Sequence, residues 1–219
     1  MTNELYWIIL VLVNFGLILT IFKLWGRQGL YVWVGFAMVL ANIQVIKTIE
    51  LFGVVATLGN IIYGTTFLAT DILSEIYGKK EAKKAVWIGF FTIISSTIIM
   101  WLCLKFIPHS SDFAHESLAV IFSVMPRIAL ASITAYIVSN LHDVWAYHFW
   151  KKKFNKIWIQ NNLSTMISQL IDSVIFCFIA FWGSYEPQVF MQILLTTYFI
   201  KWIVAAADTP FVYLANKFK

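Results

Sequence analysis

Long runs of apolar residues, separated by short polar stretches, make up most of the chain. Seven such runs lie at about 5–22, 30–46, 51–76, 86–107, 118–147, 163–182 and 189–214. A transmembrane helix needs roughly 20 mainly apolar residues, so runs of this length predict membrane spans. The pattern therefore predicts an all-α, polytopic transmembrane helical bundle of six to seven spans, with residues 1–219 forming a single integral membrane domain.

The composition excludes most soluble classes of protein. Hydrophobic residues make up 60% of the chain and charged residues only 12%, and the mean hydropathy is +0.78. Soluble domains carry about 25% charged residues. We therefore exclude soluble enzymes, nucleic-acid-binding modules and disordered proteins. Cys103 and Cys177 both lie inside apolar runs, which is typical of small core residues rather than of a disulfide or a metal site.

The charged residues predict an orientation. Twelve of the 16 basic residues follow the first, third, fifth and seventh runs, and acidic residues collect on the opposite side. Basic loops stay in the cytoplasm. Seven spans therefore place the N-terminus outside and the C-terminus in the cytoplasm of a multi-pass membrane protein, whereas six spans would put one basic cluster on the wrong side. The four clusters are Lys23 with Arg27, then Lys79, Lys80, Lys83 and Lys84, then Lys151, Lys152, Lys153 and Lys156, and finally Lys217 with Lys219.

Several charged residues lie inside the apolar runs. A charge at the centre of a membrane costs at least about 2.5–3.5 kcal/mol, so such residues face the bundle interior and indicate a functional site. Ion pairs that only hold helices together remain an open alternative. The residues are Asp71, Glu75, Arg127, Asp143, Asp172, Lys201 and Asp208.

Helical spacing brings these residues onto shared faces with other polar and aromatic side chains. Four helices thus offer a polar stripe to a common centre. Gln169, Asp172 and Lys201 lie nearest the midplane, where transporters bind substrate, and are the first candidates for ligand contact. Asp208, Glu75 and Asn60 are candidates for gating or coupling, although Glu75 could equally pair with Lys79. The stripes are Asn60, Phe67, Asp71 and Glu75; Tyr136, Asn140 and Asp143; Gln169, Asp172 and Phe176; and Lys201 with Asp208.

Catalytic and metal-binding motifs are missing from the sequence. There is no Walker A sequence, no H-E-x-x-H and no G-x-S-x-G, and no histidine or cysteine cluster has metal-ligand spacing. We expect no enzyme activity, no cofactor and no metal.

Four blocks carry a resemblance to a known family. They are FLATDILSEIYGKKEAKKA (67–85), RIALASITAYIVSNLHD (127–143), STMISQLIDSVIFCFIAFWG (164–183) and YFIKWIVAAADTP (198–210). Over roughly residues 30–215 the chain resembles the queuosine precursor transporter family, whose members are also described as vitamin-uptake transporters. The resemblance implies uptake, across the bacterial inner membrane, of 7-deazaguanine precursors of a modified tRNA nucleoside: the cyano base, the aminomethyl base or queuine.

The resemblance also bears on fold and partners. It implies a fold related to the substrate-binding subunits of energy-coupling-factor transporters. The first run lacks the A-x-x-x-A surface with which such subunits often dock a partner, so we expect a solitary carrier in the lipid bilayer, with no ATPase and no nucleic acid partner. A homodimer, the coupling ion, a carrier for another heterocycle or vitamin, and a partner-dependent binding subunit all stay open.

The implied substrate suggests roles for the buried groups. A deazaguanine presents N1–H and a 2-amino group side by side, and one carboxylate can accept both hydrogen bonds. Asp172 is the first candidate and Asp71 the second. The remaining roles are a donor to the O6 carbonyl from Lys201, Arg127 or Gln169; an aromatic platform from Phe67, Tyr136 or Phe176; a further polar contact from Asn140; and a second acid, Asp143 or Glu75, for an aminomethyl substrate.

Overall fold

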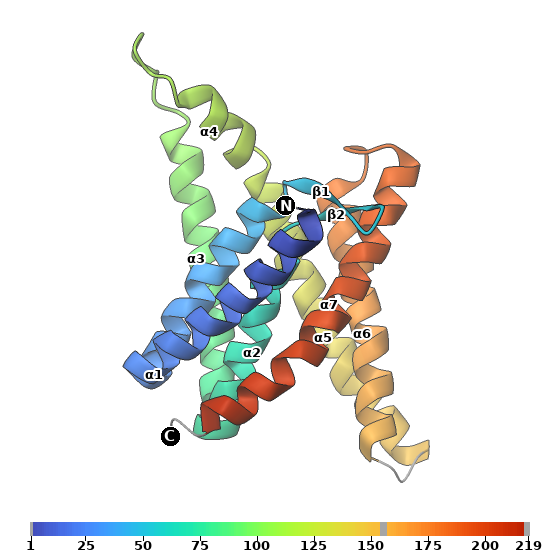
Figure 1. Cartoon of the computed structure of the whole chain (residues 1–219). Helices are drawn as coiled ribbons and strands as arrows, with labels where there is room; N and C mark the ends of the chain where they lie inside the picture. Colours follow the sequence, from blue (N-terminus) through green and yellow to red (C-terminus); the bar gives the residue numbers. More distant parts are fainter. Residues whose placement is uncertain (1, 154–156, 217–219) are drawn as a thin grey trace.

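The first two apolar runs form one helix that bends back on itself. In a computed structural model, which describes residues 2–153 and 157–216, α1 extends over Asn3–Gln44 with a non-helical Gly26 at φ 54 and ψ −134. A Cβ at Gly29 would lie 2.4 Å from the Ile21 carbonyl oxygen, so the reversal needs glycine at both positions. The two arms of α1 lie side by side and antiparallel (Figure 1). Side chains are described except at 143, 144, 147, 148, 150–153, 157–165, 205–210, 212, 213 and 216.

The predicted third span began too early. Residues 51–57 belong to an antiparallel hairpin of β1 (Thr48–Leu51) and β2 (Val54–Thr57), and helix α2 starts only at Asn60 and ends at Tyr77. Phe52 and Gly53 have φ of 51 and 78, as a two-residue hairpin turn of type I′ requires. Five of the eight strand residues are β-branched, which favours extended backbone over helix.

The predicted fifth span is two helices. The short α4 (His115–Phe122) precedes α5 (Met125–Lys153), and Pro126 lies in the first turn of α5, where its missing N–H costs no helical hydrogen bond. The other helices agree with the predicted runs apart from their ends. They are α3 (Lys79–Cys103), α6 (Ile157–Phe181) and α7 (Pro187–Asn216).

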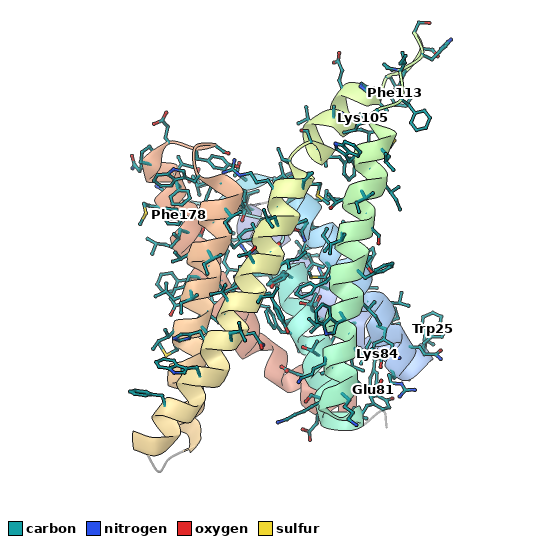
Figure 2. All side chains as sticks on the ribbon, turned by 180° about the vertical axis from the view of Figure 1, so that it is seen from behind. Trp25, Glu81, Lys84, Lys105, Phe113 and Phe178 are labelled. Atoms are coloured by element: carbon teal, nitrogen blue, oxygen red, sulfur yellow. The ribbon has the colours of Figure 1, made fainter. Side chains whose placement is uncertain are left out.

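The bundle is an all-α membrane fold with a small β-hairpin at one end. Three segments of the described chain are long and apolar enough to cross a membrane: Asn3–Gln44, Lys79–Cys103 and His115–His142, which joins α4 to most of α5. Large apolar side chains cover the outside of the helices, Trp25 and Phe178 among them (Figure 2). Lipid-facing helices have such a surface.

Basic residues lie at the end of the bundle opposite the β-hairpin. This end contains the bend of α1, the α2–α3 junction and the α5–α6 junction (Figure 1). Arg27 forms an ion pair with Glu81 at 3.4 Å, and the Lys84 ammonium lies 5.3 Å from the ring centroid of Tyr31. These contacts fix the second arm of α1 against the start of α3. We refer to the two ends as the basic end and the hairpin end.

The helices pack into two groups. The arms of α1 pack mainly on α2 and α3, α5 packs mainly on α6, and α7 contacts both α2 and α6. Between the two groups direct packing is sparse, and α5 and α6 diverge from α2 and α3 toward the basic end (Figure 1). Interior polar side chains collect where the two groups face each other.

Candidate functional site

A cavity of about 470 Å³ lies between the two helix groups. Small-molecule sites have volumes of about 300–1,000 Å³, so this cavity has the size for one small ligand. Its lining is unusual for a membrane bundle because it mixes hydroxyl, amide and carboxylate groups with aromatic rings. The polar and aromatic members are Tyr63, Thr66, Phe67, Thr70, Asp71, Phe90, Tyr136, Ser139, Asn140, Ser168, Gln169 and Asp172.

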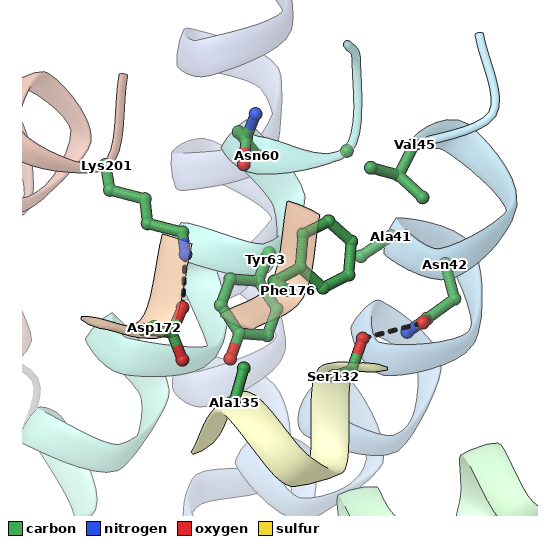
Figure 3. Close-up of a pocket in the computed structure, with 11 residues that line it drawn as sticks. Ala41, Asn42, Val45, Asn60, Tyr63, Ser132, Ala135, Asp172, Phe176 and Lys201 are labelled. Carbon is green, nitrogen blue, oxygen red and sulfur yellow. Dashed lines mark hydrogen bonds and ion pairs between the residues drawn. The ribbon is translucent and has the colours of Figure 1, made fainter. Parts of the chain in front are cut away.

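An ion pair between α6 and α7 stands at one edge of this cavity. The Lys201 Nζ donates to Asp172 Oδ2, and the two residues are only 8% and 4% exposed (Figure 3). Ser139 Oγ donates to the other oxygen, Oδ1, at 3.3 Å. Burying either charge alone would be costly, whereas the pair is neutral as a unit. Both residues were predicted to contact ligand, and the structure shows them in contact with each other.

A second, smaller cavity lies on the hairpin side of the ion pair. Its volume is about 30 Å³, which holds a water molecule or two but no nucleobase. Asn42 and Ser132 line it and share a hydrogen bond of 2.9 Å from the serine hydroxyl to the amide oxygen (Figure 3). Tyr63 and Asp172 line both cavities and so form the boundary between them.

Two groups in the large cavity have unused hydrogen-bonding capacity. Asp71 faces the cavity from α2 and has no hydrogen bond or ion pair with any residue that the structure describes. Gln169 Oε1 is buried, and within the described part of the chain nothing donates to it. A buried polar atom without a partner costs free energy, so Gln169 Oε1 indicates a place for a ligand group or water, whereas Asp71 is exposed and open to either.

Aromatic rings form two walls of the large cavity. On α2, Tyr63 and Phe67 pack edge to face with centroids 5.3 Å apart. Phe90 of α3 and Tyr136 of α5 pack in the same way at 5.1 Å. Rings locked in such pairs are rigid surfaces for a planar ligand.

The predicted site residues divide between the two cavities. Six of them line the large cavity: Phe67, Asp71, Tyr136, Asn140, Gln169 and Asp172. Asn60, Phe176 and Lys201 line the small one, together with Asp172. Glu75 is exposed and lines neither cavity. The side chains of Asp143 and Asp208 lie outside the described residues.

Arg127, which was predicted as a donor to the ligand, lines neither cavity. Its Nε donates to the Ile179 carbonyl at 2.5 Å and its Nη2 to the Trp182 carbonyl at 2.6 Å. Its Nη1 reaches Ser184 Oγ at 3.4 Å. Carbonyls at the end of a helix have no helical donor, and a cation there is favourable. Arg127 therefore ties the start of α5 to the end of α6.

Tyr63, Phe90 and Ser139 line the large cavity but were not predicted. Tyr63 lies four residues before Phe67, and Ser139 three residues after Tyr136, so helical spacing from predicted residues could have found both. Phe90 carries no such signal, since α3 has no other polar or aromatic stripe toward the centre.

A helical membrane bundle with a polar and aromatic cavity between its helices has the architecture of a small-molecule transporter. Residues 57–215 match the model of the family described as "Putative vitamin uptake transporter". The chain belongs to this family of membrane transporters.

Three relatives carry more specific names. The chain is 45% identical to the "Probable queuosine precursor transporter" of Bacillus subtilis over 99% of this chain and 96% of that protein. It is 26% identical to the "Queuosine precursor transporter" of Escherichia coli, over 75% of this chain and 74% of that one. A "Probable queuosine precursor transporter" of Haemophilus influenzae is 28% identical over 60% of this chain and 54% of its own length. No solved structure matches the chain.

Proposed function

We propose that this chain carries 7-deazaguanine precursors of queuosine across the bacterial inner membrane. The names of the three relatives support the substrate class, above all the 45% identity over nearly the whole length of the Bacillus subtilis protein. The observation that carries the proposal is the cavity of about 470 Å³, in which a carboxylate and an amide without partners face aromatic walls. A planar base with donors along one edge needs these groups.

Asp71 is the better candidate for the bidentate contact in this arrangement. Its carboxylate can accept both N1–H and the 2-amino group, since no described residue occupies it. Asp172, the first candidate from the sequence, already accepts from Lys201 and Ser139. Asp172 then forms part of the end wall of the cavity and does not make the first contact with the base.

The other contacts follow from the same cavity. Gln169 Oε1 accepts an N–H of the base, and the Asn140 amide donates to its O6 carbonyl, since the hydroxyls of Thr66 and Thr70 already donate to backbone carbonyls of their own helix. The ring lies against Phe67 and Tyr136, the members of the two aromatic walls that were predicted from the sequence.

The orientation proposed from the charges agrees with this architecture. The two arms of α1 with α2, α3, α5, α6 and α7 give seven spans, and the basic end then faces the cytoplasm. In this orientation Asp71, an exposed residue of the large cavity, lies on the cytoplasmic side of the ion pair. The protein works in this proposal as a solitary carrier.

The test is restoration of queuosine in tRNA. The host is a bacterium that makes no precursor and lacks its own transporter, and each precursor is supplied separately at low concentration with the matching salvage enzymes present. The wild-type chain restores queuosine with at least one precursor. Loss of the charged acceptor in Asp71→Asn lowers initial uptake by about tenfold or more, the equivalent of roughly 1.5–3 kcal/mol.

Glu116→Gln is the control, because Glu116 lies on α4, is exposed and lines neither cavity. It retains uptake close to the wild-type level. Immunoblots of membranes show whether each variant is present in the same amount. If verified wild-type protein restores queuosine with none of the precursors, the proposed substrate class is wrong.

A further inference from the structure

The two cavities lie one after the other along the bundle. The small cavity is lined by Gly59 and Asn60, at the start of α2. The large cavity reaches Thr70 and Asp71, about three turns further toward the basic end. Only the boundary formed by Tyr63, Asp172 and the Lys201 ion pair separates them.

Packing alone does not explain the polar residues around the small cavity. Asn42, Asn60 and Ser132 come from three different helices and are 3%, 6% and 7% exposed. The Asn60 side chain donates only a long hydrogen bond, of 3.5 Å, to the Thr57 carbonyl, whereas Asn42 Nδ2 donates to the Met38 carbonyl at 2.7 Å and its oxygen accepts from Ser132. Buried polar groups with weak partners cost free energy in a membrane bundle, where apolar side chains would pack without that loss.

Two unpaired polar atoms continue this polar zone toward the hairpin end. Thr57 Oγ1, at the end of β2, and Gln44 Oε1, at the end of α1, are buried and have no hydrogen-bond partner within the described part of the chain. Polar atoms thus extend from the ion pair to the base of the β-hairpin. Such unpaired polar groups are expected where side chains bind a polar ligand in another conformation of the protein and therefore lack partners in this one.

The β-hairpin is attached to α7 at this end by two hydrogen bonds. The Val55 N–H donates to Gln192 Oε1 at 2.9 Å, and the Thr196 hydroxyl lies 3.1 Å from the Val55 carbonyl while sharing its one proton with the Gln192 carbonyl of its own helix at 2.7 Å. Both contacts cross from the hairpin to α7, which also carries Lys201. We call this pair of bonds the hairpin strap.

We propose that the small cavity of Asn42, Asn60 and Ser132 is the outer section of the substrate path, closed here by the hairpin strap and separated from the inner cavity by the Asp172–Lys201 pair and Tyr63. It receives a small planar heterocycle through amide and hydroxyl contacts when the hairpin end opens. The identity of that heterocycle rests on the proposed function; the path itself does not.

The packing indicates which parts move. Because α5 and α6 pack mainly on each other, and Arg127 ties their ends at the hairpin side, they form one unit. The Asp172–Lys201 pair joins this unit to α7. Separation of α6 from α7 therefore opens the boundary and widens the outer cavity at the same time.

Thiol labelling tests the path without any substrate. Ser132 and Ser139 lie seven residues apart on the same face of α5, and they line the outer and the inner cavity. Ser132→Cys and Ser139→Cys are made in a background in which Cys103 and Cys177 are serine. The probe is a membrane-impermeant cationic methanethiosulfonate, applied from either face of the membrane.

The expected pattern is asymmetric. Ser139→Cys reacts from the basic end only, and Ser132→Cys is protected from both faces while the strap is intact. Cutting the strap with Gln192→Leu and Thr196→Val raises labelling of Ser132→Cys from the hairpin face by about tenfold or more, as a shift in the closed population of that size requires. The proposal is overturned if Ser132→Cys stays protected from the hairpin face in the strap variant, or if it is labelled from the basic end before it is labelled from the hairpin face.

A second measurement does not depend on the strap variants. Ser132→Phe fills the small cavity and lowers uptake by at least about tenfold, while binding to the inner cavity of purified protein stays close to wild type. Leu130→Phe adds the same ring at a position on α5 that is 60% exposed, and serves as the control. Full uptake by Ser132→Phe would overturn the proposed path.

The two proposals fail differently. A chain that transports none of the precursors but shows the labelling pattern keeps the path and loses the substrate class. A chain that transports a precursor while Ser132→Phe has no effect keeps the substrate class and loses the outer section.

Discussion

The buried Asp172–Lys201 pair leads to a prediction about stability. Two substitutions that each destabilise the protein should destabilise it much less when they are combined. Lys201→Met leaves a carboxylate that is 4% exposed without its cation, and Asp172→Asn leaves an ammonium that is 8% exposed without its anion. Breaking a buried pair by removing one partner costs roughly 3–5 kcal/mol, because the remaining charge stays desolvated. Removing both partners leaves no unpaired charge, so the double variant loses much less.

The assay is thermal unfolding of detergent-purified protein. For a chain of 150–250 residues, each kcal/mol shifts Tm by about 2–4 °C, so each single variant lowers Tm by roughly 6–20 °C. The double variant lies well above either single variant. Lys105→Met, which removes an exposed cation, is the control and shifts Tm little, as surface substitutions do.

The same comparison of the wild type, the two single variants and the double variant can also refute this reasoning. Additive losses in the double variant would show that the two side chains stabilise the fold independently. A single variant as stable as Lys105→Met would show that the charge is solvated in the folded protein and is not held by its partner.

Three further predictions concern packing and hydrogen bonds, and thermal unfolding checks each of them. Gly64→Ala places a Cβ 2.2 Å from Val204 Cγ1, where α2 meets α7, and lowers stability by about 1–3 kcal/mol; Val204→Ala in the same chain recovers part of the loss, and no recovery would exclude this clash. Arg127→Lys keeps the charge but cannot reach all three acceptors at the end of α6, so it lowers Tm nearly as much as Arg127→Met; full stability of the lysine variant would show that charge alone suffices. Trp33→Phe removes the 2.9 Å bond to Thr65 Oγ1 and costs about 0.5–1.5 kcal/mol, whereas Trp87→Phe, on an exposed ring, costs less.

Hydropathy predicted the helices well because a span must be continuously apolar over a fixed length. The same signal failed where apolar residues are not helical. Residues 51–57 are as apolar as a helix end, and only the turn at Phe52 and Gly53 distinguishes them as a hairpin. The break before Met125 was likewise missed, since two short bends interrupt an apolar run without changing its hydropathy.

Helical periodicity predicted which faces turn inward but not which side chains meet. Phe67 with Asp71, and Tyr136 with Asn140, line the same cavity as their spacing suggested. Lys201 and Asp208 were placed on one face of the same helix, yet Lys201 binds Asp172 on α6. Contacts within a helix follow from sequence distance, whereas contacts between helices depend on rotation and depth, which the sequence does not state. Arg127 shows the same limit, because its acceptors are backbone carbonyls that no residue type reveals.

The pairing of Lys201 also changes the charge of the site. If both acids and the lysine faced the ligand separately, the cavity would hold three competing charges. In the structure Asp172 and Lys201 neutralise each other, so among the described side chains Asp71 supplies the uncompensated charge in the large cavity. Two like charges about 6 Å apart repel by roughly 3 kcal/mol at an effective dielectric constant near 20. In the proposed site we therefore expect an anionic heterocycle to be disfavoured and a neutral or cationic one to be accepted. Under this proposal, the selectivity for ligand charge follows from an ion pair that does not itself need to contact the ligand.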